Sequence, residues 1–151
     1  MASVITSERP DSDVASALIT ELENHLRPLY PAESRHGYSV EKLLRENVAF
    51  FVIHYEEQPA GCGGVQLFGS DYAEIKRMYV RPSLRGLGLG KLMVEHLETY
   101  VRNHGIGVLR LETGIHQGEA IALYERMGFK ATGPFGEYRE DPLSRFYEKK
   151  I

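Results

Sequence analysis

The most constraining feature of the sequence is a change of hydrophobic period near its middle. Three strand patterns follow in close order, at residues 49–55, 61–68 and 73–80. Apolar residues then recur at helical spacing from Leu89 to Val101, and Gly105 stands where a left-handed residue would end the helix. A β-meander followed by an amphipathic helix predicts a sheet with helices packed on its faces.

The N-terminal part adds a short strand and two helices. Residues 3–6 predict a strand, and apolar residues at helical spacing from 14 to 29 predict a helix with Asp11 and Asp13 as capping candidates. Residues 29–38 are expected to form a loop. A short helix should follow at 40–45, capped by Ser39.

The C-terminal part alternates strands with one helix. A strand is expected at 108–113, a helix around 120–127 that ends at Gly128, and two further strands at 130–132 and 145–149. The predicted order of elements is therefore β, α, α, β, β, β, α, β, α, β, β. This order corresponds to a mixed sheet with helices on its faces.

The composition narrows the class of protein. With 151 residues, 42% of them hydrophobic, the chain is predicted to form a single domain over residues 1–151. A net charge of -3 and the lack of a long basic tail argue against general nucleic-acid binding. One cysteine, Cys62, permits no internal disulfide and no cysteine-based zinc site. The longest apolar run, residues 48–53, is too short to cross a bilayer, so we expect a soluble, cytosolic protein.

A glycine-rich turn between a strand and a helix gives the strongest local signal, Arg85-Gly86-Leu87-Gly88-Leu89-Gly90-Lys91. Glycines let the backbone approach a ligand closely, and the first amides of a helix form an anion site. Five basic residues and no acidic one lie between 75 and 91, which favours a phosphate ligand. The spacing matches neither a Walker A loop nor a dinucleotide fingerprint. The alternative is a plain turn with solvated basic side chains.

Three linked motifs resemble the GNAT superfamily of acyl-CoA-dependent N-acyltransferases. Arg85, Gly88 and Gly90 match its central motif, residues 74–82 resemble its fourth strand, and residues 120–129 resemble its late helix. The resemblance implies an α/β (α+β) fold with a mixed, mostly antiparallel twisted sheet and about four flanking helices. It also implies acetyl-CoA as co-substrate, no metal, and an amine acceptor attacked directly in a ternary complex.

The same resemblance implies residues for binding CoA. Backbone amides of the turn would hold its diphosphate, and backbone groups of strand residues 78–80 would pair with its pantetheine arm. These residues are Met78, Tyr79, Val80, Arg85, Gly86, Leu87, Gly88, Leu89, Gly90 and Lys91. Where the family often has an asparagine that contacts the pantetheine, this chain has Gln117, so that contact stays open.

Direct transfer needs a base, an oxyanion donor and an acid. An alkylammonium group with a pKa near ~10 must lose a proton before it attacks a thioester, and Glu74 is the candidate base. Its alternative role is a strand carboxylate paired with a neighbouring Lys or Arg. The resemblance suggests the Met78 amide as the oxyanion donor and Tyr124 as the acid for the thiolate. A core aromatic on the apolar helix face is the other interpretation of Tyr124.

Two other reactive side chains have plainer interpretations. His116 precedes the late helix and is expected to be an exposed loop histidine. Cys62 is expected to be a small buried residue of a strand, and not a nucleophile, because direct attack needs no acyl-enzyme.

The acceptor side gives mixed signals. Arg35 and His36 would suit an acceptor carboxylate, whereas Glu137, Glu140 and Asp141 would suit a second amine, and all of them can be solvated loop charges. We favour a small-molecule amine. A protein lysine or N-terminus remains open as the acceptor, as does a non-catalytic acyl-CoA-binding module. A homodimer is also left open.

Overall fold

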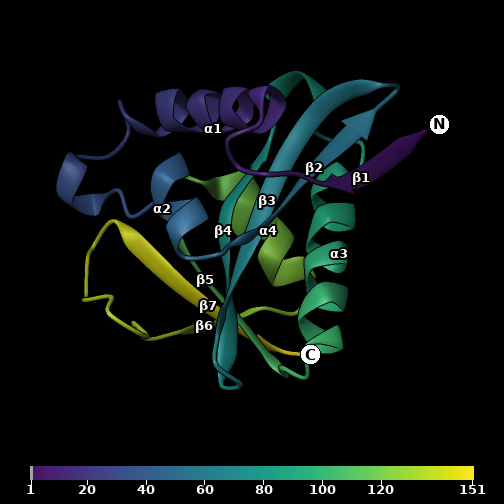
Figure 1. Ribbon diagram of the computed structural model, residues 1–151. Coiled ribbons are helices and arrows are strands. Elements are labelled where there is room, and N and C mark those ends of the chain that lie inside the picture. Colours follow the sequence, from purple (N-terminus) through teal and green to yellow (C-terminus); the bar gives the residue numbers. More distant parts are fainter. Residues whose placement is uncertain (1) are drawn as a thin grey trace.

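The computed structural model describes residues 2–151, which form one seven-stranded sheet flanked by helices (Figure 1). The strands are β1 (Ser3–Ser7), β2 (Ala49–Tyr55), β3 (Gln58–Phe68), β4 (Tyr72–Val80), β5 (Val108–Gly114), β6 (Lys130–Thr132) and β7 (Ser144–Lys150). The helices are α1 (Asp13–Leu26), α2 (Val40–Arg45), α3 (Leu89–Asn103) and α4 (Gly118–Arg126), with 3-10 turns η1 (Ala32–Ser34) and η2 (Pro82–Leu84).

The sheet is mixed and mostly antiparallel, as expected. Its strand order is β1-β2-β3-β4-β5-β7-β6, and β4 with β5 is the parallel pair while the other neighbours run antiparallel. The predicted order of strands and α-helices is confirmed, and the two 3-10 turns are additions. None of the helices described in residues 2–151 combines the length and apolarity that a bilayer crossing needs.

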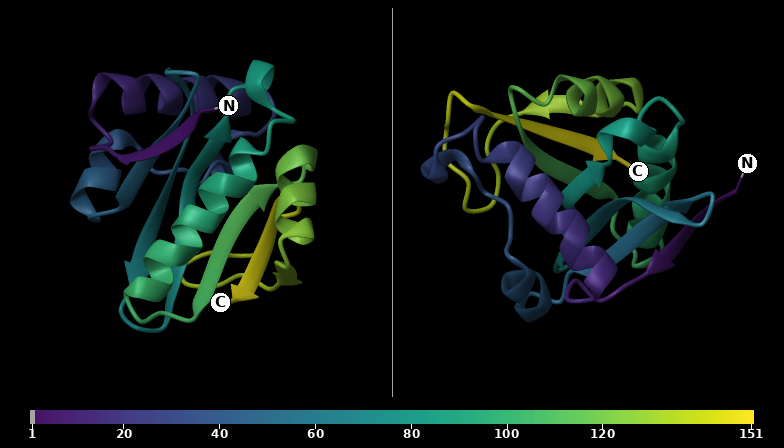
Figure 2. Two further views of the ribbon diagram at one scale, coloured as in Figure 1. Left: turned by 90° about the vertical axis from the view of Figure 1, so that its right-hand side faces the viewer. Right: turned by 90° about the horizontal axis from the view of Figure 1, so that it is seen from above.

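Two helical layers bury opposite faces of the sheet, because neighbouring strand residues point to opposite sides. In β2, Phe51 and Ile53 join the core cluster that packs with Met93 of α3. Phe50 and Val52 join the other cluster, with Leu18 of α1. Figure 2 shows α1 and α3 on different sides of the strands. The middle of the sheet is therefore buried on both faces.

The start of α1 differs from the prediction in its cap. Ser12 is the N-cap, and its Oγ accepts a hydrogen bond from the amide of Ala15 at 3.1 Å. Asp11 instead pairs with the guanidinium of Arg9, at 2.9 Å from Nε, and Asp13 is the first helical residue. Helix α1 also ends at Leu26, earlier than the apolar pattern indicates.

The strand β3 begins at Gln58, three residues before the predicted start. Tyr55 pairs directly with Gln58, so Glu56 and Glu57 form a two-residue hairpin turn with φ values of 50° and 67°. Such turns need positive φ at both positions, which sequences usually signal with Asn or Gly. Two glutamates carry no such signal, and the strand start was therefore predicted too late.

The strands β4 and β5 separate soon after they begin to pair. Their register pairs Ala73 with Leu109 and Glu74 with Arg110, and no later residue of β4 pairs with β5. Backbone groups of β4 from Ile75 to Val80 therefore face a gap on that side. A strand edge with free N–H and C=O groups can accept another extended chain.

Candidate active site

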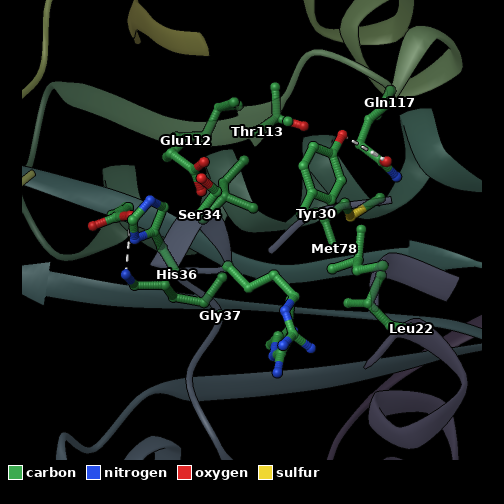
Figure 3. A pocket seen from close by; sticks show the side chains of 18 of the residues that line it. Leu22, Tyr30, Ser34, His36, Gly37, Met78, Glu112, Thr113 and Gln117 are labelled. Carbon is green, nitrogen blue, oxygen red and sulfur yellow. Dashed lines mark hydrogen bonds and ion pairs between the residues drawn. The ribbon is translucent and has the colours of Figure 1, made fainter. Parts of the chain in front are cut away.

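A cleft of about 120 Å³ lies at the split between β4 and β5. Its walls come from α1, the loop around η1, the two separating strands and the start of α4. Figure 3 shows Glu112 and Thr113 on one side of it and His36 and Gly37 on the other. Within residues 2–151, no group of three or more His, Cys, Asp or Glu side chains is placed to hold a metal ion.

A β-bulge in β4 shapes the wall at Met78. Cys62 pairs with Tyr79 and Gly64 with Lys76, so Arg77 and Met78 lie opposite the single residue Gly63. Arg77 takes a φ of 55°, which is unusual for a residue with a side chain. The bulge changes the register in the middle of the strand, and Met78 lines the cleft.

The Arg77 side chain fastens the bulge to neighbouring elements. Its Nε donates to the carbonyl of Tyr38 at 2.9 Å, and its Nη2 donates to Glu23 of α1 at 3.1 Å. A Cβ on Gly37 would lie 2.2 Å from Nη1 of Arg77, so glycine is needed where the guanidinium passes. The strained residue is thus held by contacts with α1 and with the loop before α2.

The glycine turn has the backbone geometry of an anion site. Gly86 and Gly88 have φ values of 83° and 80°, and Gly88 caps α3 without a side-chain hydrogen bond. No atom lies within 4 Å of a Cβ built on either glycine, so the turn is open on that side. A Cβ on Gly90 would lie 2.9 Å from Leu123 Cδ2, so this glycine lets α4 approach. The first amides of α3 have no partner within the helix, as is general for helix N-termini, which favour anions.

The other predicted binding residues connect this turn to β4. Arg85 Nε donates to the carbonyl of Val80 at 3.0 Å, which fixes the turn to the end of the strand. Leu89 is buried and anchors α3, whereas Leu87 is exposed. Tyr79 packs in the α1-side cluster, and its hydroxyl donates to Glu21 at 3.1 Å. The turn and the free edge of β4 are therefore neighbours.

The positive charge predicted around the turn is mostly neutralised. Lys76 lies 2.9 Å from Glu74, Arg77 lies 3.1 Å from Glu23, Arg81 lies 2.7 Å from Glu21, and Arg85 lies 3.8 Å from Glu119. Three of these partners come from α1 and α4, which are distant in sequence. Of the five basic residues, only Lys91 has no ion pair within the described chain. An anion site here depends chiefly on the helix amides.

Tyr124 of α4 both packs in the core and lines the cleft. Its side chain is 4% exposed, and its ring meets the ring of Phe129 edge-on at a centroid distance of 5.5 Å. Burial raises the pKa of the Tyr124 phenol well above its usual value, so the group stays protonated. The core interpretation of the residue is confirmed, its role as an acid stays a prediction, and the protonated phenol can donate a hydrogen bond.

Glu74 lines the cleft but is already engaged. Its Oε2 lies 2.9 Å from Lys76 Nζ and accepts a 2.5 Å hydrogen bond from the hydroxyl of Tyr138. Glu74 and Lys76 are 3% and 6% exposed, so the pair is shielded from water. These contacts match the alternative of a strand carboxylate with a neighbouring lysine. Two donors of the protein therefore already occupy the Oε2 atom of Glu74.

Glu112 of β5 is a second cleft carboxylate, which the sequence analysis missed. Its Oε2 accepts a hydrogen bond from Ser144 Oγ at 2.9 Å. Burial raises the pKa of this carboxyl, and the charge of Glu74 adds to the effect, while Ser144, His36 and Lys76 oppose it. Strand alternation was the available signal, since Leu109 and Leu111 are buried in the core and Glu112 follows on the other face.

Tyr30, also missed, joins the two sides of the cleft. Its hydroxyl donates to Gln117 Oε1 at 3.1 Å and accepts from the amide of His116 at 2.9 Å (Figure 3). A Cβ on Gly114 would lie 2.1 Å from the same hydroxyl, so this glycine makes room for the phenol. Gln117, predicted to contact pantetheine, lines the cleft and keeps its amide nitrogen as a donor.

The plainer interpretations of His116 and Cys62 agree with the structure. His116 is exposed in the turn before α4. Cys62 is fully buried, and its thiol donates to the carbonyl of Arg77 at 3.3 Å. Burial raises the pKa of that thiol to about 12, so a thiolate nucleophile is disfavoured.

Comparisons with known proteins agree with this geometry. The family model described as "Acetyltransferase (GNAT) family" matches residues 14–129. A protein of Azospirillum brasilense named IAA acetyltransferase is 40% identical over 148 residues, covering 97% of each chain. A crystal structure of a Klebsiella pneumoniae protein classed as an acyl-CoA N-acyltransferase has a TM-score of 0.83 and 34% identity, covering 98% of this chain and 97% of that one.

A more distant structure shares the fold. The PaiA N-acetyltransferase of Thermoplasma acidophilum, in complex with coenzyme A, has a TM-score of 0.77 and 22% identity, with full coverage of both chains. The sequence motifs, the split sheet and these matches lead to one conclusion. The chain belongs to the acetyltransferase (GNAT) family and is an acetyltransferase.

Proposed function

We propose that the protein transfers an acetyl group from acetyl-CoA to the primary amine of a small molecule, by direct attack in a ternary complex. The observation that carries this proposal is the split between β4 and β5, which places a free strand edge beside the glycine turn and opens into a cleft. A thioester lying along that edge would present its carbonyl inside the cleft.

The coenzyme would use backbone groups at both ends of this path. Amides of residues 85–91 would hold the diphosphate at the start of α3, and residues 78–80 of β4 would pair with the pantetheine. The free amide nitrogen of Gln117 would donate to the same arm. The fold shared with a protein solved in complex with coenzyme A supports this placement.

The chemistry requires one bond to form and one to break. The amine nitrogen attacks the thioester carbonyl, the amide of Met78 donates to the resulting oxyanion, and the carbon–sulfur bond then breaks. The leaving thiolate takes its proton from the Tyr124 phenol, which burial keeps protonated. The acceptor ammonium first loses one proton to a carboxylate of the cleft, which later releases it to water. As the intermediate collapses the nitrogen loses a second proton, which restores the Tyr124 phenol, and the products are an amide and CoA.

Two carboxylates are candidates for the base. Glu74 remains one, although Lys76 and Tyr138 both bind its Oε2. Glu112 suits the role better, because a base works best when its pKa lies near the working pH and burial raises the pKa of this group. We propose Glu112 as the principal acceptor of the proton, with Glu74 as the alternative.

A small acceptor suits the small volume of the cleft, about 120 Å³. Tyr30 crosses from the loop after α1 to the start of α4, and its two hydrogen bonds close that side. A protein lysine would need a longer open groove.

The direct test measures thiol release from acetyl-CoA against a library of small amines and lysine peptides, with calorimetry of acetyl-CoA binding in parallel. We expect release that depends on a small amine, and loss of binding in Gly88→Val as the matched negative control. Binding without release by any amine would favour a regulatory module, and release with peptides alone would favour a protein acceptor.

A further inference from the structure

The cationic side chains of the cleft are unequally paired. Lys76 lies 2.9 Å from Glu74, and Arg77 lies 3.1 Å from Glu23. His36 Nε2 lies 3.7 Å from Asp141. Lys76 and Arg77 therefore each face a carboxylate of the protein and have little capacity for another anion, and the His36 ring faces a carboxylate as well.

Arg35 is different. It follows η1, lines the cleft and is half-buried, yet no carboxylate within residues 2–151 forms an ion pair with it. Its Nε is buried and makes no hydrogen bond with any described residue. Buried donors in proteins are almost always paired, because an unpaired one loses its hydration without compensation. The guanidinium of Arg35 is therefore a cation at the cleft wall that no carboxylate of the described residues holds.

The backbone of Arg35 is fixed in place. Its amide donates to the carbonyl of Ala32 at 3.2 Å, and the amide of Ser34 donates to the carbonyl of Pro31 at 2.9 Å. The preceding Tyr30 is tied to Gln117 and His116 across the cleft. The guanidinium therefore starts from a held turn, so less conformational freedom is lost when it binds a ligand.

A strand wall of the same cleft also carries Glu112, a carboxylate with no cationic partner among residues 2–151. A ligand with a cationic amine and an anionic group would complement both kinds of wall at once. We propose that the acceptor is an amine that also carries a carboxylate, and that Arg35 binds this carboxylate. The inference rests on the acetyltransferase function proposed above and narrows its substrate class.

A carboxylate fits better than a phosphate group. The planar guanidinium matches either oxyanion in a forked arrangement. A phosphate dianion, however, would meet stronger repulsion from Glu112 than a singly charged carboxylate would. The pairing of Lys76 with Glu74 also leaves no second free cation among the described strand residues of the cleft to balance the extra charge.

The test compares matched acceptors that differ in one group. Phenylalanine, its amide, 2-phenylethylamine and the corresponding aminophosphonate form one set, and norleucine, its amide and pentylamine form another. Rates of thiol release are corrected for the fraction of unprotonated amine. For at least one set we expect kcat/KM for the free acid to exceed that for the amide and the decarboxylated amine by at least about tenfold.

Variants of Arg35 then test whether this residue causes the higher kcat/KM for the free acid. In Arg35→Gln the ratio of kcat/KM between acid and decarboxylated amine should fall toward one, mainly through a higher KM for the acid. Arg35→Lys keeps the positive charge but cannot form two parallel hydrogen bonds to a carboxylate. This variant should therefore retain only part of the preference for the acid over the decarboxylated amine. Arg139→Gln, which removes an exposed arginine outside the cleft, is the control and should leave the ratio unchanged.

The outcomes are separable. Equal rates for acid, amide and decarboxylated amine would overturn the carboxylate proposal and leave the acetyltransferase function intact. A preference for the phosphonate, or a preference for the acid that survives in Arg35→Gln, would overturn it as well. Release with none of the amines would overturn the proposed small-amine function and, with it, this inference. Thermal denaturation of each variant shows whether a lost ratio reflects lost folding.

Discussion

The hydroxyl of Tyr30 donates a hydrogen bond to the amide oxygen of Gln117, 3.1 Å away. Tyr30 belongs to the loop after α1, where we propose that the acceptor binds, and Gln117 begins α4, where we propose that the pantetheine passes. The two halves of the proposed ternary complex therefore share one hydrogen bond, and a change in either wall is transmitted to the other.

Replacing Tyr30 by Phe removes this link and leaves the amide of His116 without its acceptor. We expect a loss of about 1 kcal/mol in the free energy of unfolding, the usual contribution of one hydrogen bond. The KM values for the acceptor and for acetyl-CoA should both rise a few-fold. Urea denaturation and steady-state kinetics measure the two effects, and a change in only one KM would contradict the coupling.

Tyr124→Phe tests the proton donor for the leaving thiolate. The substitution keeps the buried ring, so folding and acetyl-CoA binding should be preserved. Turnover at saturating acetyl-CoA should fall by about tenfold or more, as expected when a general acid is lost. Turnover of Tyr124→Phe equal to that of the wild type would show that Tyr124 is a core residue and not the proton donor.

Glu112→Gln and Glu74→Gln distinguish the two candidate bases. A base must be deprotonated to act, so kcat/KM falls as the pH drops through its pKa. This fall is the acidic limb of the pH-rate profile. Because the pKa of Glu112 is raised, the limb should lie above the usual pH range of a carboxyl group. In Glu112→Gln the acidic limb should disappear, and kcat/KM should fall by about a hundredfold. Glu74→Gln should keep the limb. The reverse pattern in the two pH-rate profiles would identify Glu74 as the base.

Local chemistry made much of the fold predictable. Ser39 caps α2 over the predicted residues 40–45, and its Oγ accepts from the amide of Lys42 at 3.1 Å. Gly105 and Gly128 have φ values of 76° and 93° just beyond the ends of α3 and α4, as the helix-stop pattern indicates. In each case a few neighbouring residues determine the outcome.

Long-range partners could not be predicted in the same way. The sequence around β4 is basic, but the acids that neutralise Arg77 and Arg81 lie on α1, more than fifty positions earlier. The raised pKa of Glu112 likewise depends on burial and on Glu74 from another strand. Motifs predicted a path for the coenzyme, which stays a prediction, whereas the electrostatics of the cleft follow from tertiary packing.

Gly37→Ala tests the attachment of the β4 bulge. The new Cβ would lie 2.2 Å from Nη1 of Arg77 and would displace the guanidinium from Glu23 and the Tyr38 carbonyl. We expect a loss of about 1–3 kcal/mol in unfolding free energy, the usual cost of forcing atoms into a packed site, with a lower kcat. Gly118→Ala is the matched control, because no atom lies within 4 Å of a Cβ there. Equal stability of the two variants would exclude the attachment.

Glu112 should also reduce stability at neutral pH. Its carboxyl has a higher pKa in the folded than in the unfolded chain, so the folded state binds the proton more tightly. Stability therefore falls as the pH rises from the unfolded pKa through the folded one, and the deficit persists above it.

Glu112→Gln removes the charge, so it should raise Tm at pH 7.5, and the gain should shrink as the pH falls toward 4. A gain that is independent of pH would show that altered packing, and not the charge, is responsible. A gain in Tm together with a loss of turnover would show that a costly buried carboxylate is retained for catalysis.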